Sequence, residues 1–205
     1  MTGASDREKP RKAPVQARSR ATYEAILEAA ARILEAEGLA GVTTNRVAER
    51  AGVSIGSLYQ YFPAREAILA ELVKRMRLEM SARLIAVSEG ARHLPLEEAI
   101  PQMMAAAIAR YEAEPRLTAA LEEAEARLPR DAEVLTERRR ARDAMIACLT
   151  ARGVAAPKEA ADDLIAMTRG MVRGAQAARG AVDYARLRAR IARAALGYLT
   201  YPHPD

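Results

Sequence analysis

The stretch TTNRVAERAGVSIGSLYQYF, residues 43–62, decides the fold predicted for this chain. It has the pattern of two short helices joined by a tight turn. Thr44 offers a side-chain oxygen to the free N–H groups at the start of the first helix, and Gly52 suits the left-handed position that ends it. Ser54 can cap the second helix, which stops at Pro63. The pattern predicts a helix-turn-helix, whose second helix enters the major groove of DNA.

The first turn of the second helix contains Ile55 and Gly56. A glycine inside a helix costs about 1 kcal/mol relative to alanine, and Ile55 is expected to lie largely exposed. Both features make sense where the helix must approach another molecule closely, because glycine has no Cβ and a helix N-terminus favours phosphate. The alternative interpretation is an ordinary surface pair of helices that tolerates a glycine.

The longer segment GLAGVTTNRVAERAGVSIGSLYQYFPAREAIL, residues 38–69, resembles the DNA-binding segment of the TetR family of one-component transcriptional repressors. The resemblance extends from about Ser19 to about Leu72 and so covers roughly the first third of the chain. It implies a repressor that binds a palindromic operator on double-stranded DNA as a homodimer and is released by a small, apolar effector molecule.

The same resemblance assigns DNA contacts position by position. It implies base contacts from Asn45, Ile55, Gly56, Tyr59 and Gln60, and phosphate contacts from Thr44, Ser54, Ser57, Tyr61 and Arg65. One departure lies at Ala64, where the family usually has a capping Ser, Asn or Asp.

The composition and the positions of the prolines and glycines predict an all-α chain of about nine helices. Half of the 205 residues are hydrophobic, only 4% are aromatic, and no strand-like alternation is present. We expect a flexible basic tail at 1–18, a helix-turn-helix domain at 19–65, and a helical ligand-binding and dimerisation domain at 66–205. Besides the two short helices, the expected ranges are 19–37, 64–89, 96–113, 116–127, 131–152, 158–179 and 183–200.

Charge is concentrated at the N-terminus. The first 20 residues hold six Lys/Arg and two Asp/Glu, a surplus of four, against a net charge of +5 for the whole chain. This tail could lie along DNA phosphates. A solvated terminus is an equally good interpretation of residues before Arg18.

The sequence favours a cytoplasmic protein without a membrane partner, a cofactor or a metal. Cys148 is the sole cysteine, and no apolar run is long enough to span a membrane. His93 and His203, the two histidines, lack the spacing of a metal site or a catalytic triad. No phosphate-binding glycine loop is present, and we therefore expect no enzymatic activity.

The later helices provide candidates for an effector pocket and a dimer interface. Methionines at helical spacing suit an irregular apolar pocket, although each is more often a core residue. The candidate pocket residues are Met103, Met104, Ala107, Tyr111, Met145, Cys148, Met167 and Met171. The resemblance implies a dimer interface on the last two helices, with the candidates Gly170, Gly174, Ala177, Leu187, Ile191 and Ala194.

A rival hypothesis from another class is a helical protein–protein interaction or scaffold module whose helix-turn-helix no longer binds DNA. Salt dependence separates the two, because several phosphate contacts predict duplex affinity that falls steeply with ionic strength.

Overall fold

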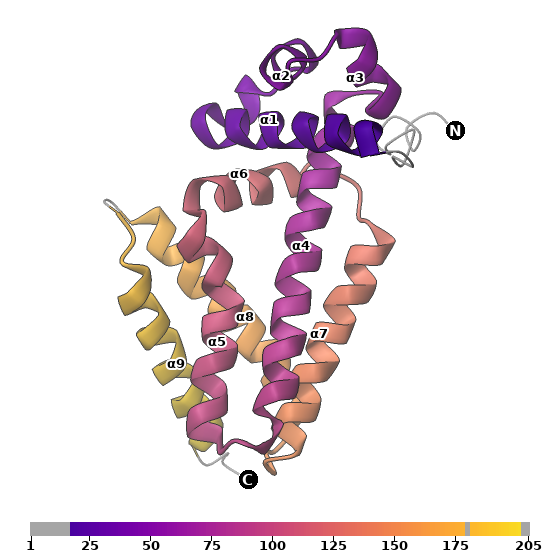
Figure 1. Cartoon of the computed structure of the whole chain (residues 1–205). Coiled ribbons are helices and arrows are strands. Elements are labelled where there is room, and N and C mark those ends of the chain that lie inside the picture. The colour runs from indigo at the N-terminus through magenta and orange to yellow at the C-terminus, as the bar shows by residue number, and fades with distance from the viewer. Residues whose placement is uncertain (1–16, 179–180, 202–205) are drawn as a thin grey trace. The chain divides into compact units, whose positions relative to one another are not determined.

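The structure, a computed structural model, describes residues 17–178 and 181–201. The described part contains nine α-helices and one 3₁₀ helix, and no strand, which confirms the all-α class (Figure 1). The predicted basic tail lies outside the described residues except for the backbone of residues 17 and 18. The elements are α1 (Ala17–Gly41), α2 (Thr44–Ala51), α3 (Ile55–Tyr61), α4 (Arg65–Gly90), η1 (Ala91–His93), α5 (Leu96–Ala113), α6 (Pro115–Glu125), α7 (Ala132–Thr150), α8 (Pro157–Ala177) and α9 (Tyr184–Thr200).

The chain divides into two compact units. Unit 1 comprises the residues up to Met76 together with Glu114–Asp131, and unit 2 comprises Arg77–Ala113 together with the residues from Ala132 on. Helix α4 thus contributes its first half to unit 1 and its second half to unit 2. Helix α6 belongs to unit 1, where it packs on α1, although the sequence placed it in the C-terminal domain. Its buried Leu117, Leu121 and Ala124 explain this packing.

Glycines interrupt α1 and end α2 at the positions that the sequence predicted. Gly38 has φ 69° and ψ −169°, so the helical path of α1 is interrupted there although the element continues to Gly41. Gly52 has φ 67°, and its N–H donates to the carbonyl oxygens of Ala48 and Glu49 at the end of α2. A side chain with a Cβ rarely adopts this left-handed conformation.

The N-cap of α2 is Thr43 and not Thr44, which corrects the sequence prediction. Thr43 has extended backbone angles, and its Oγ1 accepts a hydrogen bond from the N–H of Arg46 at 3.4 Å. Thr44 is already the first residue of the helix, and its hydroxyl oxygen lies near that of Tyr59 instead. Ser54 caps α3 as predicted, since it accepts from the N–H of Ser57 at 3.0 Å.

Unit 1 is held together by an aromatic cluster beneath α3. The ring of Phe62 stacks on that of Tyr23 with centroids 4.9 Å apart, and the guanidinium group of Arg75 lies 5.5 Å from the Tyr23 ring centroid. Arg75 also donates to Glu24 at 2.5 and 2.9 Å and to Glu71 at 2.9 Å. Burial raises the pKa of the Tyr23 hydroxyl, so this ring stays neutral. The cluster fixes α4 against α1 within the unit.

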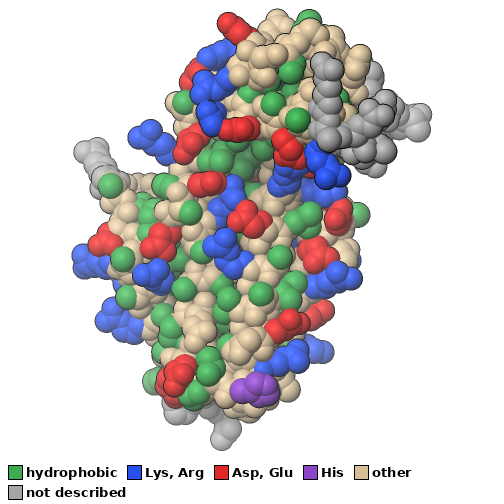
Figure 2. All heavy atoms as spheres, viewed as in Figure 1, with side chains coloured by type: hydrophobic (Ala, Val, Ile, Leu, Met, Phe, Trp, Pro, Cys, Tyr) green, Lys and Arg blue, Asp and Glu red, His purple; other side chains and the backbone are tan. Residues whose placement is uncertain are grey.

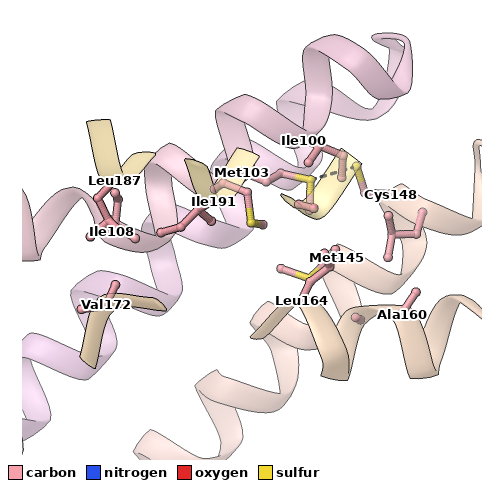
Figure 3. Close-up of a cluster of buried hydrophobic side chains, with 14 of the residues drawn as sticks. Ile100, Met103, Ile108, Met145, Cys148, Ala160, Leu164, Val172, Leu187 and Ile191 are labelled. Carbon is pink, nitrogen blue, oxygen red and sulfur yellow. Dashed lines mark hydrogen bonds between the residues drawn. The ribbon is translucent and has the colours of Figure 1, made fainter. Parts of the chain in front are cut away.

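Unit 2 is a helical bundle around a buried apolar cluster drawn from α5, α7, α8 and α9 (Figure 3). Cys148 donates its S–H to the Sδ of Met103 at 3.5 Å, and both side chains are fully buried. Arg152, just beyond α7, ties the end of that helix to the turn between α4 and α5, because its Nε donates to the Leu94 carbonyl at 2.9 Å and its Nη2 to the Ala91 carbonyl. Helices α6 and α8 begin with a proline at their first position, as helix starts allow.

Candidate nucleic-acid interface and ligand cavity

Helix α3 is anchored on one side and exposed on the other. Leu58 is completely buried, whereas Ile55 is 38% and Tyr59 42% exposed. Both are among the few large hydrophobic side chains that the described part exposes. The helix has no charged residue, and the surface over it in Figure 2 is largely uncharged. An exposed isoleucine and tyrosine without charges suit contact with base edges better than contact with water alone.

The leading end of α3 is open. Gly56 is exposed, and a Cβ built on it would meet only the Ser54 Oγ, at 3.9 Å. The Oγ atoms of Ser54 and Ser57 lie 2.8 Å apart at the same end. Glycine is therefore not required here by packing or by a left-handed backbone. Close approach of another molecule to the start of the helix would explain why a glycine is present there.

Helix α2 joins this surface through a tyrosine. The hydroxyl oxygens of Thr44 and Tyr59 are 3.2 Å apart, so the first turn of α2 and the middle of α3 present their polar groups side by side. Asn45 is exposed on the same turn, and Gln60 is exposed beside Tyr59. The structure thus brings together most of the residues that the resemblance assigned to DNA.

The other two predicted phosphate contacts, Tyr61 and Arg65, also have protein partners. The Tyr61 hydroxyl lies 2.9 Å from the Ser19 Oγ, and its ring meets Tyr23 edge-on at 6.1 Å. Arg65 pairs with Glu66 at 3.1 Å and donates to the Val42 carbonyl at 3.5 Å. Both side chains remain partly exposed, at and just beyond the C-terminal end of α3.

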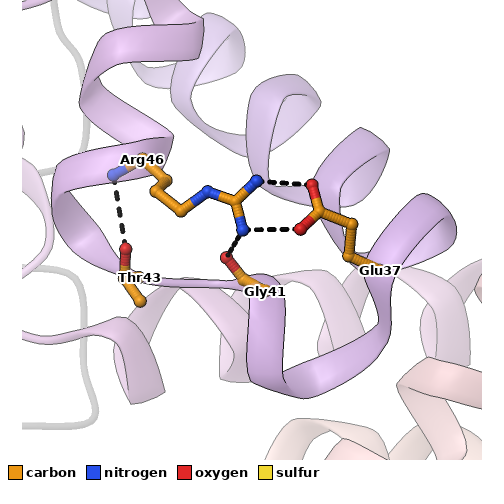
Figure 4. A network of polar contacts seen from close by, with 4 residues as sticks. All are labelled: Glu37, Gly41, Thr43 and Arg46. Carbon is orange, nitrogen blue, oxygen red and sulfur yellow. Dashed lines mark hydrogen bonds and ion pairs between the residues drawn. The ribbon is translucent and has the colours of Figure 1, made fainter.

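An ion pair that the sequence analysis missed positions α2 on the end of α1 (Figure 4). Arg46 donates to both carboxylate oxygens of Glu37 at 2.6 and 2.5 Å and to the Gly41 carbonyl at 3.2 Å. The hydrogen bonds from Arg46 lower the pKa of the Glu37 carboxyl group. A two-pronged pair of this kind fixes orientation. The two residues are nine apart and on different helices, so helical periodicity gave no signal for it.

Unit 2 contains a cavity of about 340 Å³ among α4, α5, α7 and α8. Of the predicted pocket residues, Met104, Ala107, Tyr111 and Met145 line it. Met103 and Cys148 do not; they belong to the solid core, where burial raises the pKa of the thiol. Met167 and Met171 pack on that core from outside and are also absent from the cavity wall.

The cavity wall also contains side chains that the methionine spacing did not indicate. These are Arg77, Met80, Ser81, Leu84, Leu135, Arg138, Arg139, Ala141, Arg142, Leu164, Ile165, Thr168, Arg169 and Val172. Four of them share one helix face, and this spacing is a sequence signal that could have identified them as cavity residues: Leu135, Arg138, Arg139 and Arg142.

The predicted dimer residues separate into two groups. Leu187 and Ile191 are 2% and 0% exposed and belong to the core of unit 2, so the structure corrects their assignment to a subunit interface. Their spacing reflects packing of α9 on α5 and α8. Gly170, Gly174 and Ala177 on α8 are exposed, and Ala194 on α9 is half-buried. A Cβ on either glycine would meet no atom within 4 Å.

Two kinds of site are absent from the described residues. No group of three or more His, Cys, Asp or Glu side chains there is placed to hold a metal ion, and His203 lies outside the described residues. None of the helices in that part is both long and apolar enough to cross a membrane.

The fold and the helix-turn-helix define a DNA-binding transcriptional regulator. Residues 26–72 match the sequence model of the bacterial regulatory proteins of the tetR family. The resemblance to the TetR family is confirmed by this match and by the solved structures of similar fold. No match was found among curated proteins.

The similar structures include SmeT, the repressor of the Stenotrophomonas maltophilia multidrug efflux pump SmeDEF. It is 25% identical with a TM-score of 0.67 over 91% of this chain and 98% of that one. A complex of SmeT with triclosan gives 25% identity and a TM-score of 0.63 over 90% and 100%. The TetR-family regulator PfmR from Thermus thermophilus is 20% identical, with a TM-score of 0.63 over 87% and 99%, which supports the fold.

Proposed function

We propose that this protein is a homodimeric repressor in the cytoplasm that binds a palindromic operator and is released by a small molecule. The exposed leading end of α3 carries the proposal. Ile55 and Tyr59 face solvent and Gly56 leaves open space, while Leu58 beneath them is fully buried. A buried anchor under an exposed, uncharged reading surface is what insertion into a major groove requires.

The proposed contacts are of two kinds, those that recognise bases and those that hold the phosphate backbone. Gln60 and Asn45 carry amide groups that can recognise an adenine edge, and Ile55 can contact a thymine methyl group. Gly56 and Tyr59 complete the base-reading surface. The hydroxyl groups and the guanidinium group that grip phosphate belong to Thr44, Ser54, Ser57, Tyr61 and Arg65.

Electrostatic attraction has to come from outside α3, because that helix is uncharged. Arg20 on α1 and Arg50 on α2 are exposed, and the N-terminal tail adds further basic residues. Phosphate contacts of this kind release counterions, so affinity should fall steeply as salt rises.

A dimer is proposed because one helix-turn-helix reads only a few base pairs. Two helix-turn-helix domains related by a two-fold axis bind half-sites about one DNA turn or more apart. The exposed α8 surface at Gly170, Gly174 and Ala177 supports the proposal, since small side chains let a second helix approach closely. Ala194 on α9 is the remaining predicted interface position.

Release by a ligand is proposed because unit 2 contains a cavity and because a complex of the similar protein SmeT holds triclosan. Helix α4 lines the cavity with Arg77, Met80, Ser81 and Leu84 and also contributes to unit 1. A ligand could prefer, by about 1–3 kcal/mol, the dimer conformation in which the spacing of the two helix-turn-helix domains no longer matches the half-sites. Such a ligand would weaken operator binding 5- to 150-fold.

The test is selection of bound sequences from a random duplex pool, followed by measurement of the dissociation constant at several salt concentrations. We expect a two-fold symmetric site and an affinity that falls linearly with salt on logarithmic axes. Gln60→Ala should weaken binding to the selected site roughly tenfold. Gln102→Ala, the same change at an exposed position of α5 in unit 2, is the matched control and should have no effect.

An absence of duplex binding at every salt concentration would favour the scaffold alternative. A selected site without two-fold symmetry would count against the dimer alone.

A further inference from the structure

The wall of the cavity in unit 2 is unusually rich in arginine. Five guanidinium groups line it, from Arg77 on α4, Arg138, Arg139 and Arg142 on α7, and Arg169 on α8. No Asp or Glu is among the described residues of the wall. A cavity for a purely apolar ligand would not need this side-chain type.

The arginines of α7 form part of a continuous helix face. Leu135, Arg138, Arg139 and Arg142 follow the spacing i, i+3, i+4, i+7, so all four point to the same side of the helix. Arg140, which lies between them in sequence, is exposed and pairs with Glu137 at 2.8 Å. The helix therefore directs three positive charges to the cavity and one away from it.

The arginines of the wall differ in burial and in their partners. Arg77 is only 8% exposed, and Arg142 is half-buried. Asp162 receives two hydrogen bonds of 2.6 Å from Arg142, which lower the pKa of the Asp162 carboxyl group, but Asp162 does not line the cavity. Arg77 and Arg138 also interact with other groups of the chain. Arg139 and Arg169 are exposed at the wall, so a ligand that covers them would leave them poorly solvated unless it carried negative charge.

Apart from Ser81 and Thr168, the rest of the wall is largely apolar. On α4 and α7 most of it follows the arginines, although Leu135 precedes them. On α4, Arg77 precedes Leu84, and on α7 the arginines precede Met145. Figure 1 shows α7 and the second half of α4 running in the same direction. The charged residues thus gather toward the beginning of both helices. Met80, Met104, Leu164, Ile165 and Val172 complete the apolar lining.

We propose that the cavity binds an amphipathic organic anion, with an apolar body and one carboxylate, sulfonate or phosphate group that the arginines hold. This inference rests on the proposed function only for the effect of the ligand on DNA. It differs from the small, apolar effector that the resemblance implies by adding a negative charge to the ligand. The volume of about 340 Å³ is at the small end for ligand pockets, so the ligand is of modest size.

The test compares two fluorescent probes of the same shape, anilinonaphthalene sulfonate and the uncharged phenylnaphthylamine. The chain has no tryptophan, so protein emission does not interfere. We expect the intact protein to bind the sulfonate at least about tenfold more tightly, because charge-assisted hydrogen bonds to a buried anion are strong. Decanoate should displace it, and decanol should not.

The decisive variant is the double substitution Arg139→Gln with Arg169→Gln. Both side chains are exposed at the cavity wall, and Arg139 donates to the Thr136 hydroxyl at 3.1 Å, a bond on the helix surface, so folding should survive. The preference for the sulfonate should shrink while the affinity for the neutral probe stays unchanged. The matched control, Arg140→Gln with Arg173→Gln, removes two exposed charges from the same helices outside the cavity. It should keep the preference.

Equal affinity for the two probes, or a preference that survives the Arg139→Gln, Arg169→Gln pair, would overturn the proposal. A second measurement adds decanoate to the protein bound to its selected duplex. If the anion binds in the cavity but leaves DNA affinity unchanged, the ligand class stands and the ligand response in the proposed function fails.

Discussion

The two units of this protein use glycine and alanine differently at the same kind of backbone position. In unit 1, Gly38 and Gly52 occupy left-handed conformations at φ 69° and 67°. In unit 2, Gly153 does so at 67°, but Ala156, the residue before α8, also has a positive φ of 45°. The helix-turn-helix thus has glycine at its left-handed turn position, whereas α8 starts with an alanine at such a position. The reading surface depends on local geometry, and the cavity depends on how helices assemble.

The largest effect is expected from Phe62→Ala. Phe62 is fully buried and stacked on Tyr23, and removal of such a ring costs about 3–5 kcal/mol. The cavity lies entirely in unit 2, so DNA binding should be lost while probe binding in the cavity persists. Thermal unfolding by far-UV circular dichroism and the probe titration measure the two effects. Simultaneous loss of both activities would show that the units do not fold separately.

A smaller loss is expected from Gly52→Ala. No atom lies within 4 Å of a Cβ built at this position, so the cost comes only from the left-handed backbone, about 1–2 kcal/mol. Urea unfolding gives the change in the free energy of unfolding. Unchanged stability would mean that the turn between α2 and α3 does not need its glycine.

The opposite change in unit 2 should stabilise the protein. Ala156→Gly relieves the positive φ before α8 and should raise the free energy of unfolding by up to about 1 kcal/mol. The same urea titration tests it. The exposed Ala155→Gly, one residue earlier, is the control and should give no gain, because Ala155 has no positive φ.

The smallest change in stability, and the most informative for function, is expected from Gly56→Ala. An alanine fits in the free protein and improves helix propensity, so the free energy of unfolding should rise by about 0.5–1 kcal/mol. Binding to the selected duplex should weaken nevertheless, because the added Cβ points into the space that we propose DNA occupies. A variant that is more stable and binds DNA as well as before would refute the close approach at this residue.

The sequence by itself determined the helix-turn-helix. Its turn glycine, the Ser54 cap and the stop at Pro63 are local signals, and α3 spans Ile55–Tyr61 as those signals indicate. Most later helix ends were also predicted to within a residue or two, since prolines and glycines mark them. The cap was assigned one residue late, at Thr44 instead of Thr43, because adjacent threonines have the same side chain and only the backbone angles distinguish them.

Only the tertiary structure decided which side chains meet. Met103 and Met104 are neighbours in sequence and both belong to the buried core of unit 2, yet only Met104 lines the cavity. Leu187 and Ile191 have the spacing of an interface stripe, but α5 and α8 cover them within the chain. Arg77 and Arg169 line one cavity from helices far apart in sequence. Helical periodicity tells which residues share a face, and packing alone tells what that face contacts.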